Sequence, residues 1–318
     1  MNTYSLKDIS NYIGGNLIGE DRRVSNFSID SRTINENEVF ICIKGNKYDG
    51  HQFIEDSLKK ASCIVSSRDI PKINLQNKSY IKVQDTYKSL HMITEYIRQK
   101  SKAKFIAITG SNGKTTVKEM LAHVLSDFQI TFTKGNLNNH IGVPLTIFST
   151  NQNDDYVIVE IGANGLNEIG PLAKIIKPDI AAVTNIGYAH IEGFGSLDNT
   201  AREKYSIFEY LQNDGIAVIN NDDNYTKYIS KKNKIFFGNN INFKKKLMQR
   251  AKNFPYKTYF SDISKIKEKK FNIRHKEINE IFTLKLNGDH NFLNAACVIS
   301  ISLALGIDIN LSLIHIWR

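Results

Sequence analysis

The sequence predicts an α/β protein in which a small N-terminal α/β domain is followed by a doubly wound, mostly parallel-sheet P-loop ATPase domain. From Phe105 onwards, short apolar runs alternate with segments of helical spacing, which is typical of parallel strands joined by crossover helices. The first of these runs leads into a glycine turn and then into a helical pattern, the order found at phosphate-binding loops. Ligands of such sheets bind beyond the carboxyl ends of the strands.

The N-terminal domain is expected to span residues 1–102. Ser5 caps a helix that begins at Leu6 and stops at Gly14, and the polar stretch Arg98–Lys104 marks the boundary with the next strand. Between these limits the expected order is strand, strand, helix, strand, strand, helix. These elements occupy Asn26–Asp30, Val39–Ile43, Phe53–Ala61, Ser62–Val65, Tyr80–Val83 and Thr86–Lys100.

The central domain is expected to span residues 103–310. An apolar final helix over Asn291–Leu305 stops at Gly306, whereas the lysine-rich segment Lys231–Phe282 shows only weak alternation and is expected to be irregular. The predicted parallel strands lie at Phe105–Thr109, Tyr156–Ile161, Ile180–Thr184 and Ile216–Ile219.

Residues 311–318 are predicted to be a non-native tail. The string Leu-Ser-Leu-Ile-His-Ile is similar to translated sequencing adaptor, and it interrupts a new element that would start at Asp308. We therefore expect the natural chain to continue beyond Asn310.

Composition argues against several classes of protein. The 318 residues carry a net charge of +10, but the lysine runs lie in separate polar stretches without regularly interleaved aromatic residues. We therefore expect anionic small substrates and no nucleic acid. No apolar run is long enough to cross a bilayer and no secretion signal opens the chain, so we expect a cytoplasmic protein without membrane insertion. Cys42, Cys63 and Cys297 are widely spaced, which predicts reduced, buried thiols.

The glycine turn after Thr109 has the residues of a phosphate-binding loop. Its glycines let backbone N–H groups turn towards one anion, Lys114 adds a positive charge, and the hydroxyl of Thr115 can bind a magnesium ion. The following helix points the positive end of its dipole at the same phosphates. The spacing is G-x-x-G-K-T-T, because Ile108 stands where the first glycine of the commoner motif would be. The residues predicted to bind ATP here are Gly110, Ser111, Asn112, Gly113, Lys114, Thr115 and Thr116.

Three further polar side chains follow in the central domain. Glu160 ends a hydrophobic strand, where a carboxylate needs a cation partner, although a capping or salt-bridging role is the alternative. His190 follows the next strand in a glycine-bearing loop and is a candidate ligand or phosphate contact, although a lone histidine is more often structural. Lys204 lies in a helix and by itself resembles an ordinary solvated lysine. The residues alone predict a magnesium–nucleotide enzyme.

Several longer runs narrow this prediction. In the central domain they are Thr109–Thr116 with Val117–Met120, Gly135–Thr146, Glu160–Asn164, Thr184–Ser196 and Gly288–Ala296. In the first domain they are Ser28–Arg32, Phe40–Gly45 and Asp49–His51. These runs, in this order, resemble the Mur ligases, ATP-dependent enzymes that add amino acids to the peptidoglycan precursor. Within that family the chain is most similar to the type that adds a dipeptide.

The resemblance implies ATP and Mg²⁺ as cofactors, and a monomer that joins UDP-N-acetylmuramoyl-tripeptide to D-alanyl-D-alanine through an acyl phosphate. The residues implied to be catalytic are Lys114, His190 and Lys204, and those implied to hold magnesium are Thr115, Glu160, His190 and, in carbamylated form, Lys204. Asn291 and Asn294 would face the adenine of ATP. The residues implied to bind the other substrates are Asp30, Ser31 and Arg32 for the uridine diphosphate part, with Asn138 and Asn139 in the cleft.

The chain departs from the family pattern in three ways. Tyr205-Ser206 follow Lys204 where family members often have Gly-Glu or Ser-Glu, and His140 replaces a common acidic residue. The third domain that closes over ATP in the family is expected to be absent from these 318 residues. One alternative is another Mur-type amino-acid ligase or a folylpolyglutamate synthase-like ligase; Ser28–Arg32 argues against the latter, and Gly162–Asn164 favours the dipeptide-adding type. The other alternative is a nucleotide-binding module without catalysis.

Overall fold

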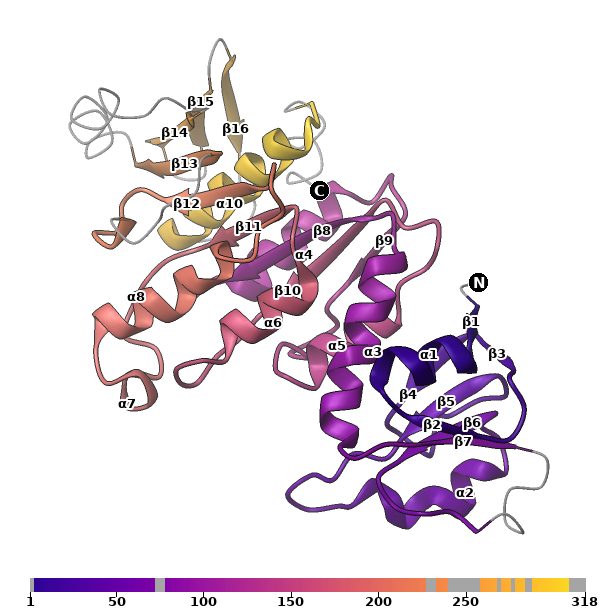
Figure 1. The fold of residues 1–318 in the computed structure, drawn as a ribbon. Coiled ribbons are helices and arrows are strands. Elements are labelled where there is room, and N and C mark those ends of the chain that lie inside the picture. The colour runs from indigo at the N-terminus through magenta and orange to yellow at the C-terminus, as the bar shows by residue number, and fades with distance from the viewer. Residues whose placement is uncertain are drawn as a thin grey trace. The chain divides into compact units, whose positions relative to one another are not determined.

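The computed structural model describes residues 3–71, 78–226, 233–239, 258–267, 270–275, 278–283 and 288–308. The chain forms two compact units, each with its own sheet (Figure 1). The first comprises Met1–Lys102 with Pro144–Asn153, and the second comprises Ala103–Val143 with Asp154–Arg318. Within the described residues, no helix is both long and apolar enough to cross a membrane. The predicted tail, residues 311–318, lies outside the described residues.

The first unit contains a five-stranded sheet. Its order is β2 (Asn16–Ile18), β7 (Ser79–Lys82), β6 (Cys63–Ser66), β5 (Glu38–Ile41) and β4 (Asn26–Ser28), and only β2 runs antiparallel to its neighbour. A two-stranded ribbon joins β1 (Tyr4–Ser5) to β3 (Arg23–Val24). The helical segments are α1 (Leu6–Ile13), η1 (Gly50–Phe53), α2 (Ile54–Leu58) and α3 (Thr86–Lys100).

The limits of α1 follow directly from its sequence. The Ser5 hydroxyl accepts a hydrogen bond from the Asp8 N–H at 3.2 Å, and Gly14 ends the helix with a φ of +64°. α1 packs against α3, and the ring of Phe27 on β4 lies 5.2 Å from that of Phe148 in the stretch Pro144–Asn153. That stretch therefore packs with the first unit.

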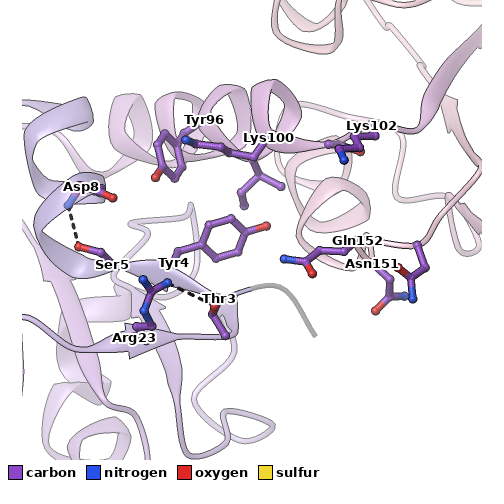
Figure 2. Close-up of a pocket in the computed structure, with 13 residues that line it drawn as sticks. Thr3, Tyr4, Ser5, Asp8, Arg23, Tyr96, Lys100, Lys102, Asn151 and Gln152 are labelled. Carbon is purple, nitrogen blue, oxygen red and sulfur yellow. Dashed lines mark hydrogen bonds between the residues drawn. The ribbon is translucent and has the colours of Figure 1, made fainter.

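A pocket of about 520 Å³ lies in the first unit (Figure 2). Tyr4 and Tyr96 line it together with Arg23, Lys100 and Gln152 (Figure 2). The predicted substrate residues Asp30, Ser31 and Arg32 do not line it, so this pocket is not the predicted uridine-nucleotide site.

The second unit contains a nine-stranded sheet in the order β16-β15-β14-β13-β12-β11-β8-β10-β9. All neighbours from β9 to β14 are parallel, and β15 and β16 add an antiparallel edge. The parallel strands are β8 (Lys104–Thr109), β9 (Ile130–Phe132), β10 (Tyr156–Glu160), β11 (Ile180–Val183), β12 (Ile216–Asn220), β13 (Lys234–Asn239) and β14 (Thr258–Lys267). The edge strands are β15 (Lys270–His275) and β16 (Ile278–Thr283).

Side chains from alternate strand positions form the core of this unit. Ile106 and Ile108 of β8 pack in one cluster with Leu121 of α4 and Val298 of α10. The second-unit helices are α4 (Lys114–Val124), α6 (Ile169–Ile176), α7 (Ile191–Phe194), α8 (Leu197–Tyr205), η3 (Ser206–Phe208) and α10 (Asp289–Leu305), and α5 (Gly142–Phe148) spans the division between the units. The alternation of strands and helices confirms the predicted fold class. The three cysteines are free and buried, as predicted.

The prediction of an irregular segment over Lys231–Phe282 is wrong for its described residues. β13, β14, β15 and β16 extend the sheet through this segment. β13 has a buried apolar run, Ile235–Phe237, whereas β14, β15 and β16 have a lysine-rich sequence, which the edge of a sheet tolerates.

Candidate active site

Two glycines of the phosphate-binding loop have no room for a side chain. The loop joins the end of β8 at Thr109 to the start of α4 at Lys114. Gly110 has a φ of +150°, and a Cβ there would lie 1.9 Å from the Thr184 Oγ1. Gly113 has a φ of +81°, and its Cβ would lie 2.3 Å from the Asn294 Oδ1. The loop therefore requires glycine at both positions.

The chain that follows β11 holds this loop in place. The Thr184 hydroxyl donates to the Asn112 carbonyl at 2.6 Å, and the Asn185 side chain accepts from the Asn112 N–H at 3.0 Å. The Ser111 hydroxyl donates to the Gly187 carbonyl at 3.1 Å. The parallel strands β8 and β11 thus end at the same edge of the sheet, where the residues after β11 hydrogen-bond to the loop after β8.

Lys114 lies across the loop from the first turn of α4. Its Nζ donates to the carbonyls of Gly110 at 2.9 Å and Ser111 at 3.2 Å. Burial lowers the pKa of Lys114 below its ordinary value, and the negative charge of Glu160 partly opposes this shift. The ammonium group is therefore placed where the loop's backbone would hold phosphates.

The Glu160 carboxylate is buried at the end of β10, with only 1% of the residue exposed. Its Oε1 accepts hydrogen bonds from the Asn138 amide at 2.8 Å and the Thr115 hydroxyl at 3.3 Å. Its Oε2 is buried without a hydrogen-bond partner. One carboxylate oxygen is thus satisfied by the protein, and the other is left for a further partner.

Sequence reasoning missed Lys118, a fully buried lysine of α4. Its Nζ lies 3.9 Å from the Glu160 Oε2, 2.8 Å from the Glu119 Oε1 and 3.1 Å from the Gly135 carbonyl. It therefore supplies the cation that a buried carboxylate needs without donating a hydrogen bond to Oε2. The sequence feature that could have indicated it is that Lys118 follows the apolar Val117 in the helix after the loop.

The residues around Glu160 fit a magnesium ion. Mg²⁺ prefers oxygen ligands, and at nucleotide sites it is held by one or two protein groups, substrate phosphates and water. The Glu160 carboxylate and the Thr115 hydroxyl supply such oxygens, and the unpartnered Oε2 is the observation that favours an ion there. Within the part of the chain that the structure describes, no cluster of three or more His, Cys, Asp or Glu side chains could hold a metal. The ion would therefore depend on the phosphates.

Lys204 is buried, so its resemblance to an ordinary solvated lysine is wrong. Only 2% of the residue is exposed, and its Nζ lies 5.3 Å from the centre of the Phe194 ring. Burial, followed by the charge of Lys114, lowers the pKa of Lys204 to about 8. The environment created by α7 and α8 therefore makes this amine much more available in its neutral form than that of an ordinary lysine.

The structure does not bring the His190 side chain into contact with this cluster. His190 precedes α7 with a φ of +57°, its side chain is exposed, and its carbonyl accepts from the N–H groups of Gly193 and Phe194. Within the described residues, the hydrogen bonds that the Glu160 carboxylate accepts come from Thr115 and Asn138 and not from the imidazole of His190. A magnesium-binding role for His190 stays a prediction.

The four predicted asparagines outside the phosphate-binding loop have different surroundings. Asn138 contacts Glu160, whereas the Asn139 side chain accepts from the backbone of Ile141 and Gly142 and thus caps α5. Asn294 is buried against Gly113 and donates to Asn291 at 3.1 Å. α10 therefore begins beside the phosphate-binding loop.

The predicted uridine-nucleotide residues lie in the first unit. Asp30 accepts two hydrogen bonds from the Arg32 guanidinium, at 2.9 and 2.7 Å, and these bonds lower the pKa of the Asp30 carboxyl. Ser31 is the half-buried residue between them. The Arg32 side chain is 86% exposed, so it is open to an anionic ligand.

Two family models match the chain: the Mur ligase middle domain over residues 108–302 and the Mur ligase family catalytic domain over residues 23–98. A UDP-N-acetylmuramoyl-tripeptide–D-alanyl-D-alanine ligase of Buchnera aphidicola subsp. Baizongia pistaciae is 37% identical over 91% of this chain and 61% of that protein. The chain spans about half to two thirds of the length of the curated relatives it matches.

Solved structures give the same result. MurF from Acinetobacter baumannii has a TM-score of 0.83 and 25% identity, over 100% of this chain and 68% of that one. MurF from Thermotoga maritima in complex with ADP has a TM-score of 0.72 and 26% identity, over 91% of this chain and 66% of that one.

The pair of Lys118 and Glu160 yields the first prediction. Lys118→Met should lower the free energy of unfolding by about 3 kcal/mol, because removing one partner leaves the other buried charge uncompensated. The double variant Lys118→Met/Glu160→Gln should recover most of that loss, since a neutral amide needs no cation. Urea denaturation measures both. Both variants lack the hydrogen bond from Lys118 to the Gly135 carbonyl, so that bond does not distinguish them. Equal losses of unfolding free energy in the two variants would show that the charges of Lys118 and Glu160 are not coupled.

The second prediction concerns the loop's glycines. Gly110→Ala should lower thermal stability, because a methyl group meets the Thr184 hydroxyl and the backbone has a positive φ. Gly187→Ala is the matched control in the supporting loop, since the nearest atom to its Cβ is the Ser111 Cβ at 3.5 Å, an ordinary contact. Thermal unfolding should separate the two variants by several degrees. Equal midpoints would contradict the steric argument.

Proposed function

Because the chain belongs to the Mur ligase family, we propose that it uses ATP to form an amide bond between UDP-N-acetylmuramoyl-tripeptide and D-alanyl-D-alanine. The observation that carries this proposal is the junction of the phosphate-binding loop with the buried Glu160 carboxylate, whose Oε2 has no hydrogen-bond partner. The names of the relatives support the dipeptide as the second substrate.

The proposed reaction has two steps. The terminal carboxylate of the tripeptide attacks the γ-phosphorus of ATP, so that a carboxyl oxygen–phosphorus bond forms and ADP leaves. The amine of D-alanyl-D-alanine then attacks the acyl carbon, the amide bond forms, phosphate leaves and the amine loses a proton. Both steps build charge on phosphate oxygens, so preorganised cations and backbone N–H groups lower the barriers.

The residues at and around the loop are proposed to bind ATP and magnesium. The N–H groups of Gly110–Thr116 and the Lys114 ammonium would bind the β- and γ-phosphates. Thr115 and Glu160 would hold a magnesium ion, which would neutralise charge on the transferring group. Asn138 orients Glu160 through its hydrogen bond to Oε1, and Asn291 and Asn294 would face the adenine.

Lys204 is proposed to act in carbamylated form. The neutral amine attacks the carbon of CO₂, a nitrogen–carbon bond forms and a proton leaves, so the side chain changes from a cation to an anion. Burial favours this step because it lowers the pKa of Lys204 to about 8. The anion, with His190, would support magnesium, whereas the ammonium form would repel it.

In the first unit, Asp30, Ser31 and Arg32 are proposed to bind the uridine diphosphate part of the substrate. The exposed guanidinium of Arg32 suits a diphosphate, which it can bind through paired N–H groups. Asp30 already fixes the direction of that guanidinium.

Phosphate release in the presence of ATP, Mg²⁺ and the tripeptide substrate tests the function. We expect release with D-alanyl-D-alanine and not with single amino acids, together with a product that carries the added dipeptide in its mass. The measurement uses this chain and also this chain followed by the remaining C-terminal part of a full-length relative. Lys114→Ala should reduce turnover by at least about 10²-fold, the usual scale for a lost electrostatic contact to the transition state.

Lys174→Ala on the surface of α6 is the control for the loss of one lysine and should leave turnover unchanged. Failure of the extended protein to produce ADP from the full substrate set would contradict the proposal. Equal rates with a single amino acid would favour another Mur-type ligase.

The lowered pKa of Lys204 yields a pH prediction. At constant dissolved CO₂, carbamylation should rise with pH through about 8, because the neutral amine is the reacting form and becomes half populated there. ¹³C NMR after incubation with ¹³C-labelled bicarbonate measures the carbamate, and Lys204→Arg should lack the signal. A signal that first rises near the ordinary lysine value of 10.5 would contradict the effect of burial.

A further inference from the structure

The carboxylate of Glu203, the residue before Lys204, binds the start of a different helix. Its Oε2 accepts from the Asn167 N–H at 2.7 Å, and its Oε1 accepts from the N–H groups of Glu168 at 2.9 Å and Ile169 at 2.7 Å. These N–H groups lie at the N-terminus of α6, where a helix leaves backbone N–H groups without partners inside the helix. The N-cap residue of α6, Glu168, makes no side-chain capping bond to them. Glu203 is buried, with 6% exposed, so the bonds are shielded from water.

The position of Glu203 within its own helix is unfavourable. It lies in the last turn of α8 (Leu197–Tyr205), where the negative end of the helix dipole disfavours an acidic residue. The N-terminus of α6 offsets this cost, because an anion there meets both the positive dipole end and three N–H donors. The hydrogen bonds to α6 therefore explain why a carboxylate lies in the last turn of α8, whereas the dipole of α8 alone would disfavour it there.

These bonds join the two segments that carry Glu160 and Lys204. β10 ends at Glu160, and the chain from there leads directly into α6 at Ile169. Lys204 follows Glu203 on α8. The junction is reinforced by Ser206, whose hydroxyl donates to the Glu203 carbonyl at 2.6 Å and which faces Gly170, where an added Cβ would lie 3.4 Å from the Ser206 Oγ.

We infer that Glu203 is a positioning residue for Lys204: by binding the N-terminus of α6, it fixes α8 so that the Lys204 amine stays buried against the ring of Phe194. The inference deepens the proposed function and rests on it for the use of Lys204. The geometry of the three hydrogen bonds is independent of that use.

The test compares Glu203→Gln with Glu209→Gln in the full 318-residue chain. Glutamine keeps the length of the side chain but removes its charge, and Glu209 is a nearby exposed carboxylate, so its variant is the matched control. The first readout is the rate of acetylation of Lys204 by dilute acetic anhydride, followed by peptide mass spectrometry. The buried Lys118 of the same unit is the internal reference for general loosening.

Loss of the charge-assisted bonds in Glu203→Gln should raise the acetylation of Lys204 relative to Lys118 by about tenfold. Glu209→Gln should leave the ratio unchanged. An unchanged ratio in Glu203→Gln, or an equal rise at both lysines, would overturn the inference, because Glu203 would then have no effect or only a general structural one.

The second readout is the Lys204 carbamate signal in ¹³C NMR. If the wild-type chain gives the signal, Glu203→Gln should weaken it by about tenfold at the same bicarbonate concentration, and an undiminished signal would overturn the inference. If the wild-type chain gives no signal, the proposed role of Lys204 fails. The acetylation ratio then still decides whether Glu203 positions the side chain, so the two failures are distinguishable.

Discussion

The buried carboxylate of Glu160 is the constraint on which the second unit depends. A carboxylate at the end of a buried strand is costly unless its oxygens are paired, and here the protein pairs them unequally. Asn138 and Thr115 satisfy Oε1, and Lys118 balances the charge from 3.9 Å without occupying Oε2 by a hydrogen bond. Side chains from α4 and from the loop before α5 therefore converge on one carboxylate and leave one of its oxygens for a ligand.

The phosphate-binding loop is held by contacts that only a parallel sheet could bring together. Thr109 and Val183 are paired across β8 and β11, so the residues after them meet at the same edge. Thr184 and Asn185 then fix Asn112 by hydrogen bonds, and Asn294 fills the space at Gly113. These contacts fix the shape of the loop, which reduces the ordering that phosphate binding requires.

The sequence was sufficient to predict the parallel sheet, the glycine turn between β8 and α4, and the place of Glu160 at the end of a strand, because buried strands appear as apolar runs and the turn is a local pattern. It was not sufficient to predict the strands within Lys231–Phe282, where β14, β15 and β16 are rich in polar residues, as strands at a sheet edge can be. The burial of Lys118 and Lys204 also escaped prediction. It comes from tertiary packing against β10 and Phe194, which residue spacing along a helix does not encode.

The charges around the loop explain why the state of Lys204 matters. Lys118 and Lys204 are buried and Lys114 is half-buried, and the Glu160 carboxylate attracts both Lys114 and Lys118. The positive charges of Lys114 and Lys204 favour a polyphosphate but oppose a divalent cation. The mutual repulsion of Lys114 and Lys204 is relieved if Lys204 gives up its proton, the direction in which its pKa is shifted. Under the proposed function, carbamylation carries this change one step further, because it replaces a cation that opposes magnesium by an anion that favours it.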